Sequence, residues 1–344
     1  MKVLITGISG RIGANLAKAL IDEGHEVRGL VWGKDSRLEK FEGLPVELVE
    51  GSLVSPTDVN GVVNGVEAIC HLGAAFQGGG PFSNEDYFEI NARGTFNMLE
   101  AARENAGNLK HFFFASTDAT YEKYPPGGMS DPIREDEMSQ KPGGWYALSK
   151  VLGEEMCRGY HRSYQLPISI FRFAFVAAGD EILNFPQFRL DNWQHAYAGR
   201  TQGAAVETRQ QLLEFGDAGE RLLIARDENG RSYKKHIADV RDIVLGFLAA
   251  IGKPDAIGET FQLAGPKPFT WEETVPYLAQ KLGVDYVDVR LADNTPTYYE
   301  FDLAKGARLI NYRPQFDIFK MIDSALEFRQ GATSDVIPTE VTSA

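Results

Sequence analysis

The sequence predicts an α/β protein in which a doubly wound parallel sheet is followed by a smaller C-terminal lobe. Short runs rich in β-branched and aromatic residues alternate with helical patterns through the first half of the 344 residues, which is typical of a parallel sheet. A glycine-rich turn follows the first of these runs and opens a helix. Beyond Val176 the alternation becomes irregular, which indicates a second, smaller lobe.

The expected strands cover residues 2–6, 26–31, 46–49, 68–72, 111–115 and 168–176, with a later strand at 260–263. Ile12, Leu16 and Leu20 recur at helical spacing and predict a helix directly after the first strand. Further helices are expected at 83–105, at 145–163, from near Asp239, and at 271–282 with Thr270 as the N-cap.

The turn after the first strand carries three glycines, Gly7, Gly10 and Gly13, with Arg11 and Ile12 between the last two. A strand, a glycine turn and a helix in this order point free backbone N–H groups and a helix N-terminus toward an anion. Glycine permits the tight turn and the close approach of the backbone to a pyrophosphate. The pattern therefore predicts a Rossmann-type dinucleotide site.

We therefore expect residues 1–176 to form a dinucleotide-binding core. Residues 177–330 are expected to form mainly a substrate-binding lobe, with 236–265 returning to the core. The Ser/Thr-containing segment 331–344 is expected to be a mobile tail.

Composition excludes several classes of protein. Acidic residues outnumber basic ones by 48 to 35, so the formal charge of −13 offers no basic surface for nucleic acid. Cys70 and Cys157 are far apart and fit neither a disulfide framework nor a zinc site, and no metal site is predicted. No segment approaches the ~20 apolar residues that span a bilayer. We expect a cytoplasmic protein with a small-molecule substrate.

Tyr146 and Lys150 are four residues apart on an expected helix, so their side chains share one face. A nearby ammonium group favours phenolate and lowers the pKa of a tyrosine toward the range useful for proton transfer. The same spacing recurs at Tyr277 and Lys281. Only the first pair lies downstream of an apolar strand ending in hydroxyls, Ser116 and Thr117, so we assign the chemistry to that pair and interpret the second as a chance occurrence on a surface helix.

Together these motifs resemble the extended short-chain dehydrogenases/reductases, the NAD-dependent epimerase/dehydratase family. The resemblance covers most of residues 1–265 and implies a homodimer that pairs the helices at 83–105 and 145–163. It implies a catalytic role for Thr117, with Ser116 as the alternative, and a contact between Lys150 and the nicotinamide ribose. Additional cofactor-binding residues are implied at Leu72, Gly73, Ala74 and Asn91.

Cofactor choice depends on the end of the second strand, where NAD enzymes commonly place an acid that binds the adenosine ribose. Here Val31 occupies that position, Trp32 could stack beside adenine, and Lys34 could pair with a 2′-phosphate. These residues favour NADP slightly over NAD, and Ser52, where relatives often place an aspartate, leaves both open.

Candidate substrate residues are Asp118, Phe175 and Arg189. The resemblance places an asparagine where Phe175 stands, which weakens a nucleotide-sugar assignment, and a glutamate where Ala119 stands, which disfavours a dehydratase. The sequence predicts NAD(P)-dependent hydride transfer at a carbinol or carbonyl carbon of a sugar-like or other small polar substrate. A redox-neutral sugar epimerase with retained NAD is the alternative, and a non-catalytic dinucleotide sensor is a weaker one.

Overall fold

A parallel sheet of seven strands forms the centre of the computed structural model, which describes residues 1–344 except 34, 77–79, 106, 138–139, 333 and 341–344. Its spatial order is β11-β6-β5-β4-β1-β2-β3. The strands are β1 (Lys2–Thr6), β2 (Glu26–Val31), β3 (Val46–Glu50), β4 (Ala68–His71), β5 (His111–Thr117), β6 (Ile168–Phe173) and β11 (Thr260–Leu263). All seven residues of β5 are buried, as expected for a central strand covered on both faces. The predicted Rossmann-type sheet is confirmed.

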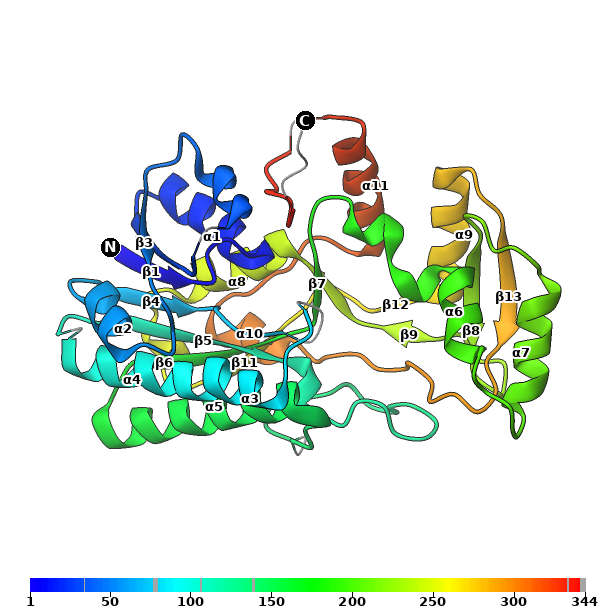
Figure 1. Cartoon of the computed structure of the whole chain (residues 1–344), viewed down its shortest axis with the longest axis horizontal. Helices are drawn as coiled ribbons and strands as arrows, with labels where there is room; N and C mark the ends of the chain where they lie inside the picture. Colours follow the sequence, from blue (N-terminus) through cyan, green and yellow to red (C-terminus); the bar gives the residue numbers. More distant parts are fainter. Residues whose placement is uncertain (34, 77–79, 106, 138–139, 333, 341–344) are drawn as a thin grey trace.

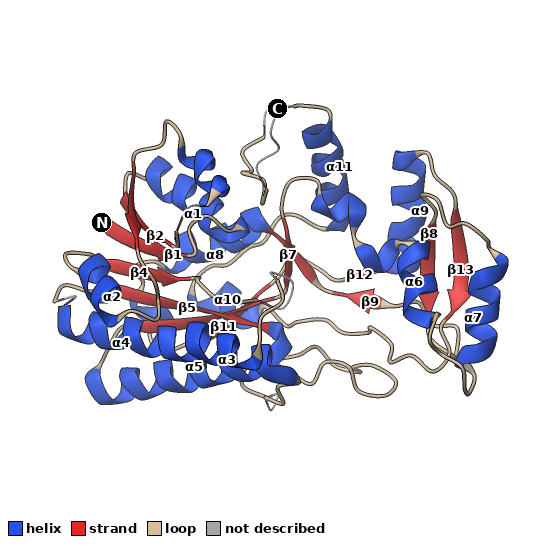
Figure 2. Cartoon of the chain, in the orientation of Figure 1, coloured by secondary structure: helices blue, strands red, loops and turns tan. Residues whose placement is uncertain are grey.

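Helices cover both faces of the sheet (Figures 1 and 2). One face packs against α1 (Arg11–Asp22) and α8 (Val240–Ala250), whose apolar residues share a core with β1 and β6. The other face packs against α2 (Pro56–Val63), α4 (Gly94–Asn105) and α5 (Gly144–Tyr164). Residues 237–263 supply α8 and β11, so the chain returns to the sheet after building the first part of the second lobe and before completing it.

The C-terminal lobe has its own apolar core and lies at the far end of the molecule from β3 (Figure 1). Its elements are α6 (Leu190–Tyr197), α7 (Ala205–Glu214), β8 (Leu222–Arg226), α9 (Trp271–Leu282), β13 (Tyr286–Arg290) and α11 (Ile318–Arg329). The parallel pair β8–β13 forms a small sheet. Between the lobes run the pairs β7 (Phe175–Ala177) with β10 (Ile237–Asp239), and β9 (Lys234–Lys235) with β12 (Phe269–Thr270).

Three expected elements differ in detail from the structure. The helix expected at 83–105 consists of α3 (Asn84–Asp86), a π-helical segment at Tyr87–Arg93 and α4. The strand expected at 168–176 is interrupted at Ala174, because the chain leaves β6 and pairs with β10 as β7. Thr270 does precede α9, but its hydroxyl donates to the Glu273 carboxylate instead of capping the backbone.

The C-terminal segment 334–340 lies against α1 and differs from the free tail that its composition indicates. Asn15 of α1 exchanges two hydrogen bonds of 2.8 Å with the backbone of Ile337, and Val336 is buried in the core beside α1. The Thr339 hydroxyl donates to Glu181 at 2.6 Å. Within the described ranges, no helix is both long and apolar enough to cross a membrane.

Two glycines on α5 provide a test of how this helix packs on the sheet. A Cβ atom at Gly153 would lie 2.3 Å from Cζ of Phe114, whereas one at Gly159 would meet no atom within 4 Å. We expect Gly153→Ala to lower the free energy of unfolding by about 1–3 kcal/mol through overpacking. Gly159→Ala is expected to raise it by about 0.5–1 kcal/mol through helix propensity. Urea denaturation measures both, and equal stabilisation by the two substitutions would contradict the packing of α5.

Candidate active site

The glycine turn packs tightly against the end of β4. Gly7 adopts a φ of +68°, and a Cβ atom there would lie 2.8 Å from Cα of Gly73. A Cβ atom at Gly13 would lie 2.3 Å from the Gly7 carbonyl oxygen. Gly10 precedes α1, whose first turn contains no acidic residue. The turn therefore presents a helix N-terminus that no acidic residue of the helix's own first turn neutralises.

A buried network holds the chain that follows β4 against this turn. The Thr6 hydroxyl accepts a hydrogen bond from the Gly73 backbone N–H at 2.9 Å and contacts Nδ1 of His71 at 2.8 Å. On the other side of the ring, Nε2 of His71 contacts the Thr95 hydroxyl at 3.1 Å. Leu72, Gly73 and Ala74 consequently lie beside the glycine turn, as the sequence predicts for one cofactor wall.

Asn91 connects that wall to α5. Its carboxamide oxygen accepts from the Ala75 N–H at 2.8 Å, and its nitrogen donates to the Ala75 carbonyl and the Ser149 hydroxyl, both at 2.9 Å. Asn91 lies in the π-helical segment, a departure from regular helix often found at functional sites. The side chain is buried and engaged by protein, so its position suits orienting the wall and α5.

Arg11 and Ile12 are the other predicted cofactor residues of the turn. The Arg11 guanidinium forms an ion pair with Glu181 of the C-terminal lobe, at 2.7 Å from Nε and 2.8 Å from Nη2. Ile12 is partly buried against the core shared by α1 and the sheet. The structure thus joins the start of α1 to the second lobe through Arg11.

The adenosine end of the expected site contains an acid that the strand pattern misses. Asp35 accepts a hydrogen bond from the Ser9 hydroxyl of the glycine turn at 2.8 Å. Hydrogen bonds from Arg37 lower the pKa of Asp35 to about 2 despite partial burial, so the carboxylate is ionised at neutral pH. Val31 is buried and Trp32 is 81% exposed. Lys34 lies outside the described residues. The sequence pattern does not predict Asp35, because this residue lies in a loop four residues beyond the end of β2.

Tyr146 and Lys150 lie on the face of α5 that meets the end of β5. The Lys150 ammonium donates to the Ala115 carbonyl at 2.9 Å, and burial lowers the pKa of Lys150 to about 8. Burial raises the pKa of Tyr146 to about 12, and a hydrogen bond with Thr117 opposes that rise. The expectation that Lys150 lowers the pKa of Tyr146 is therefore wrong for this structure, because desolvation of the phenol outweighs the favourable contacts.

The structure separates the two hydroxyls at the end of β5. Ser116 donates to the carboxylate of Glu154 at 2.5 Å and is used in the protein interior. The Thr117 side chain acts to lower the pKa of Tyr146, and its oxygen accepts from the Ala119 N–H at 3.2 Å. Thr117 and Lys150 thus lie at the same end of β5 as Tyr146, whereas the Ser116 hydroxyl is engaged by Glu154.

The three candidate substrate residues do not form one group. Asp118 follows Thr117 and forms a buried ion pair with Lys123. Phe175 of β7 is 41% exposed and packs on Phe185, with ring centroids 5.3 Å apart. Arg189 is engaged elsewhere, because its guanidinium donates to Glu220 at 2.7 Å and to the Gly219 carbonyl at 3.1 Å.

Two lysines near Asp118 and Phe175 were not identified from the sequence. Lys123 pairs with Asp118, and Lys235 of β9 lies 5.6 Å from the Phe175 ring centroid. Both come from segments whose local patterns contain no recognisable motif. The sequence gives only an indirect indication of such lysines. A lysine in a segment that folds into the interior needs a partner or a ligand.

The second Tyr–Lys pair has structural partners in the C-terminal lobe. Tyr277 donates to Asp323 of α11 at 2.8 Å, and Lys281 lies 2.7 Å from the same carboxylate. His236 bridges two backbone groups, the Gly265 carbonyl and the Phe301 N–H. Asp239 caps α8 by accepting from the Arg241 N–H. In the part of the chain that the structure describes, no group of three His, Cys, Asp or Glu side chains could hold a metal ion.

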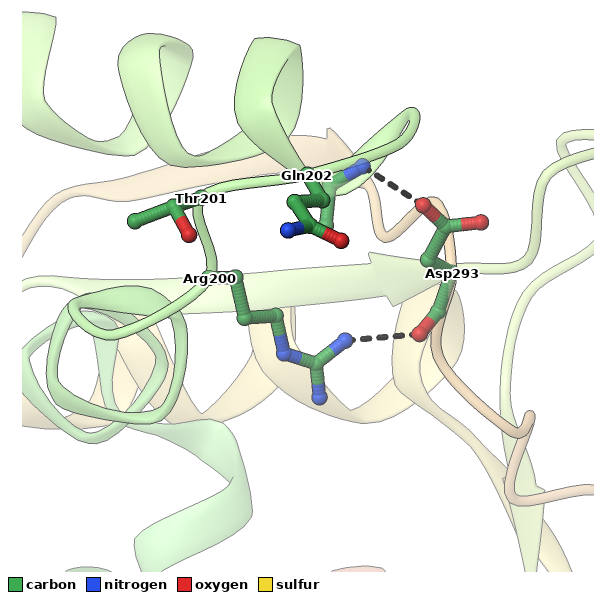
Figure 3. A pocket seen from close by; sticks show the side chains of 5 residues that line it. Arg200, Thr201, Gln202 and Asp293 are labelled. Carbon is green, nitrogen blue, oxygen red and sulfur yellow. Dashed lines mark hydrogen bonds between the residues drawn. The ribbon is translucent and has the colours of Figure 1, made fainter.

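One cavity of the C-terminal lobe lies away from these groups. It has a volume of about 320 Å³ and is lined by Arg200, Thr201, Gln202, Ala205 and Asp293 of the C-terminal lobe (Figure 3). Its polar groups already bond to one another: Arg200 donates to the Asp293 carbonyl at 2.7 Å, and the Ala205 N–H donates to the Asp293 carboxylate at 2.9 Å. The charged groups of this cavity are therefore engaged, and its volume does not identify a catalytic site. We place the candidate site instead where the functional groups described above lie together.

A Rossmann-type sheet, a glycine turn at a helix N-terminus and a Tyr–Lys pair beside a strand-end threonine together define the class of dinucleotide-dependent short-chain dehydrogenases/reductases. Comparison with known proteins gives the particular family. Residues 3–264 match the NAD dependent epimerase/dehydratase family, and the chain belongs to it.

Individual relatives match along nearly the whole chain. An uncharacterized UDP-glucose epimerase, YtcB, of Bacillus subtilis is 26% identical over 91% of this chain and 93% of its own length. The UDP-glucuronate 4-epimerase of Thermodesulfobacterium geofontis is 25% identical over 92% of each chain. A crystal structure of a short-chain dehydrogenase/reductase superfamily protein from Agrobacterium tumefaciens, with bound NAD, superposes with a TM-score of 0.81 at 30% identity, covering 96% of this chain and 98% of that one.

Proposed function

We propose that the chain is a sugar epimerase that holds NAD and inverts one carbinol centre of its substrate. The observation that carries this proposal is the convergence of Thr117, Tyr146 and Lys150 at the carboxyl end of β5, beside the glycine turn. The two full-length relatives described above are named as UDP-sugar epimerases, which makes a nucleotide-linked sugar the first substrate to test.

The residues present fit a dinucleotide. Only glycine can occupy positions 7 and 13, where a Cβ atom would strike the backbone, and the N-terminus of α1 is free of acidic side chains. Gly10 and Gly13 would lie along the pyrophosphate, and Asp35 would lie near the adenosine ribose. When bound, the cofactor supplies reversible removal of a hydride from the carbinol carbon.

Tyr146 moves the proton that accompanies this chemistry. Its phenolate oxygen takes the hydroxyl proton as the carbinol becomes a ketone, and the phenol returns a proton to the oxygen when the centre is reduced on its opposite face. Thr117 donates a hydrogen bond that orients the substrate oxygen. Lys150 is fixed by the Ala115 carbonyl, and the ammonium stabilises the phenolate electrostatically once ligands displace water.

The site has no base for the elimination of water at the position where dehydratases of the family carry a glutamate. Ala119 occupies it, so the site supports oxidation and reduction but not dehydration. A net dehydrogenase would use the same residues. Incubating the purified protein with UDP-glucose distinguishes the two: an epimerase forms the inverted sugar without a lasting absorbance change at 340 nm, whereas a dehydrogenase accumulates the reduced cofactor.

Replacing the proposed acid–base group tests the assignment directly. We expect Tyr146→Phe to lower turnover roughly 100- to 10,000-fold, because it deletes the transferable proton while the ring still packs against Tyr87. NAD affinity and thermal stability are expected to stay near their original values. The matched variant Tyr277→Phe, from the second Tyr–Lys pair, is expected to keep its turnover. Near-normal turnover in Tyr146→Phe would overturn the mechanism.

The sequence alone slightly favours NADP, but Asp35 leads us to propose NAD. Its carboxylate reaches the glycine turn through Ser9 and would repel a 2′-phosphate while accepting hydrogen bonds from ribose hydroxyls. Fluorescence titrations are expected to give tighter binding of NAD than of NADP. Asp35→Asn is expected to reduce the ratio of NAD affinity to NADP affinity by up to about tenfold, which is the effect of one charge interaction near a surface. Asp22→Asn, at the far end of α1, is the control, and a preference for NADP in the original protein would contradict the proposal.

The homodimer proposal rests on exposed apolar side chains of the expected interface helices. Phe88, Phe96, Trp145 and Leu152 lie on the π-helical segment, α4 and α5, and all four are exposed. Light scattering at micromolar concentration is expected to give twice the mass of 38.1 kDa. Phe96→Glu combined with Leu152→Glu is expected to shift the mass toward the monomer, while Leu213→Glu, at a more exposed site on α7, leaves it unchanged. A monomeric original protein would exclude the dimer.

A further inference from the structure

Residues 334–340, which we call the strap, run across helix α1 near the C-terminal end of the chain. Val336 is 7% exposed and packs in the core beside α1, and the backbone of Ile337 exchanges two hydrogen bonds of 2.8 Å with Asn15. Figure 1 shows this segment, coloured red, between α11 and α1. An apolar contact and a reciprocal pair of hydrogen bonds therefore hold the strap on the helix that follows the glycine turn.

The far end of the strap belongs to a ring of contacts around the glycine turn. The Thr339 hydroxyl donates to Glu181 at 2.6 Å, and the same carboxylate holds the Arg11 guanidinium at 2.7 Å. The Lys40 ammonium donates to the Thr339 carbonyl and, at 3.0 Å, to the Ser9 carbonyl. Ser9 and Arg11 are two positions apart in the turn, so the chain itself closes the ring.

The ring joins three parts of the protein that are distant in the sequence. The first is the glycine turn. The second is the 3₁₀ helix Ser36–Phe41, which carries Lys40 and directly follows Asp35, the acid proposed for the adenosine ribose. The third is the 3₁₀ helix Glu181–Asn184, which lies beyond β7. The strap supplies the contact between the second part and the third, because Thr339 bonds to both.

The strap reaches the glycine turn through groups other than its backbone N–H donors. The contact through Lys40 uses the Ser9 carbonyl, and the contact through Glu181 uses the Arg11 guanidinium. A pyrophosphate at the N-terminus of α1 would bind the N–H groups of the backbone. The strap and a dinucleotide therefore use different groups of the turn, and the ring can stay closed while the cofactor is bound.

We propose that the strap retains the cofactor: it holds the glycine turn, the helix beside Asp35 and the second lobe together, and so slows the release of NAD. This inference rests on the proposed function, because it takes the glycine turn as the NAD site. An epimerase that oxidises and then reduces one molecule has to keep the same cofactor through both half-reactions. Release requires the parts that surround a ligand to separate, and such motions set the rate of release in many enzymes.

Removal of the strap tests its effect on release. We expect deletion of residues 334–344 to speed the dissociation of NADH roughly 10- to 100-fold, because the bonds to Asn15, Lys40 and Glu181 are lost together. NADH is the fluorescent form of the cofactor. Stopped-flow fluorescence therefore measures the rate when an excess of NAD displaces bound NADH, and no sugar substrate is needed.

A milder variant separates retention of the cofactor from stability of the fold, because the deletion also removes Val336 from the core. Thr339→Val keeps the shape of the side chain and removes the hydroxyl that donates to Glu181. We expect release about three- to tenfold faster, with the melting temperature of the cofactor-free protein nearly unchanged. Ser334→Ala is the matched control, because the Ser334 hydroxyl accepts from the Val336 N–H inside the strap itself. Its release rate is expected to stay at the original value.

A double-mutant cycle tests the route through Glu181. Glu181→Ala removes the group to which the Thr339 hydroxyl donates. If the strap acts through the ring, Thr339→Val changes the release rate little when Glu181 is already replaced. Two effects that multiply in the double variant would show that Thr339 acts by another route, and the ring would be overturned.

The outcomes separate this inference from the proposed function. Release of NADH at the original rate in both the deleted protein and Thr339→Val would overturn the strap and leave the epimerase standing. Tighter binding of NAD after deletion would show that the strap obstructs the site, which also overturns the proposal. Faster release on deletion and in Thr339→Val supports the strap even if no sugar is inverted, and that result would count against the epimerase alone. An original protein that binds neither NAD nor NADH would overturn both.

Discussion

The buried ion pair between Glu154 and Arg172 fixes the helix on which the candidate site depends. Arg172 of β6 donates to both carboxylate oxygens of Glu154 on α5, at 2.9 and 2.7 Å. Burying two charges is expensive, and the protein offsets that cost with further hydrogen bonds to Glu154 from Ser116 and Gln140. Tyr146, Lys150 and Glu154 follow one another at intervals of four residues, so anchoring the third aligns the other two with the end of β5.

The position of the site follows from the order of the strands. In the sheet, β2 lies on one side of β1 and β4 lies on the other, so the order of the strands reverses at β1. The loops that follow β1 and β4 diverge at this reversal. Open α/β sheets bind ligands at such a point, beyond the carboxyl ends of the strands. Gly7 and Gly73 meet there, and Asn91 ties the same region to α5 through Ser149. The proposed dinucleotide wall and the helix that carries the proposed proton-transfer group are thus parts of one hydrogen-bonded framework.

The sequence was sufficient to predict the sheet, the glycine turn and the Tyr–Lys helix because each has a local signature. Thr117 could be proposed because it ends an apolar strand. Distinguishing its role from that of Ser116 required knowing which of the two hydroxyls faces Glu154. Asp35 was missed because it reaches Ser9 from an irregular loop. Arg189 was misplaced because its partner, Glu220, lies 31 residues away in the sequence. The sequence is least informative where the direction of a side chain depends on a partner that is distant in the sequence. A local residue pattern does not show such a partner.

The burial of Lys123 and Lys235 illustrates the same limit. The two lysines are 112 positions apart, and neither stands in a recognised motif. Only the fold shows that both are buried near Asp118. The burial of a charged side chain is therefore information that neither composition nor periodicity contains.

The late return of the chain to the central sheet has a consequence for how the protein is made. Helix α8 and strand β11 complete one face and one edge of the sheet, yet they follow about two thirds of the chain. Until these two elements have been made, α1 alone covers part of that apolar face and the edge of β6 lacks its partner strand. Unpaired strand edges and exposed apolar faces promote association between nascent chains. Synthesis speed and chaperone access should therefore influence the yield of folded protein more than the stability of the finished molecule does.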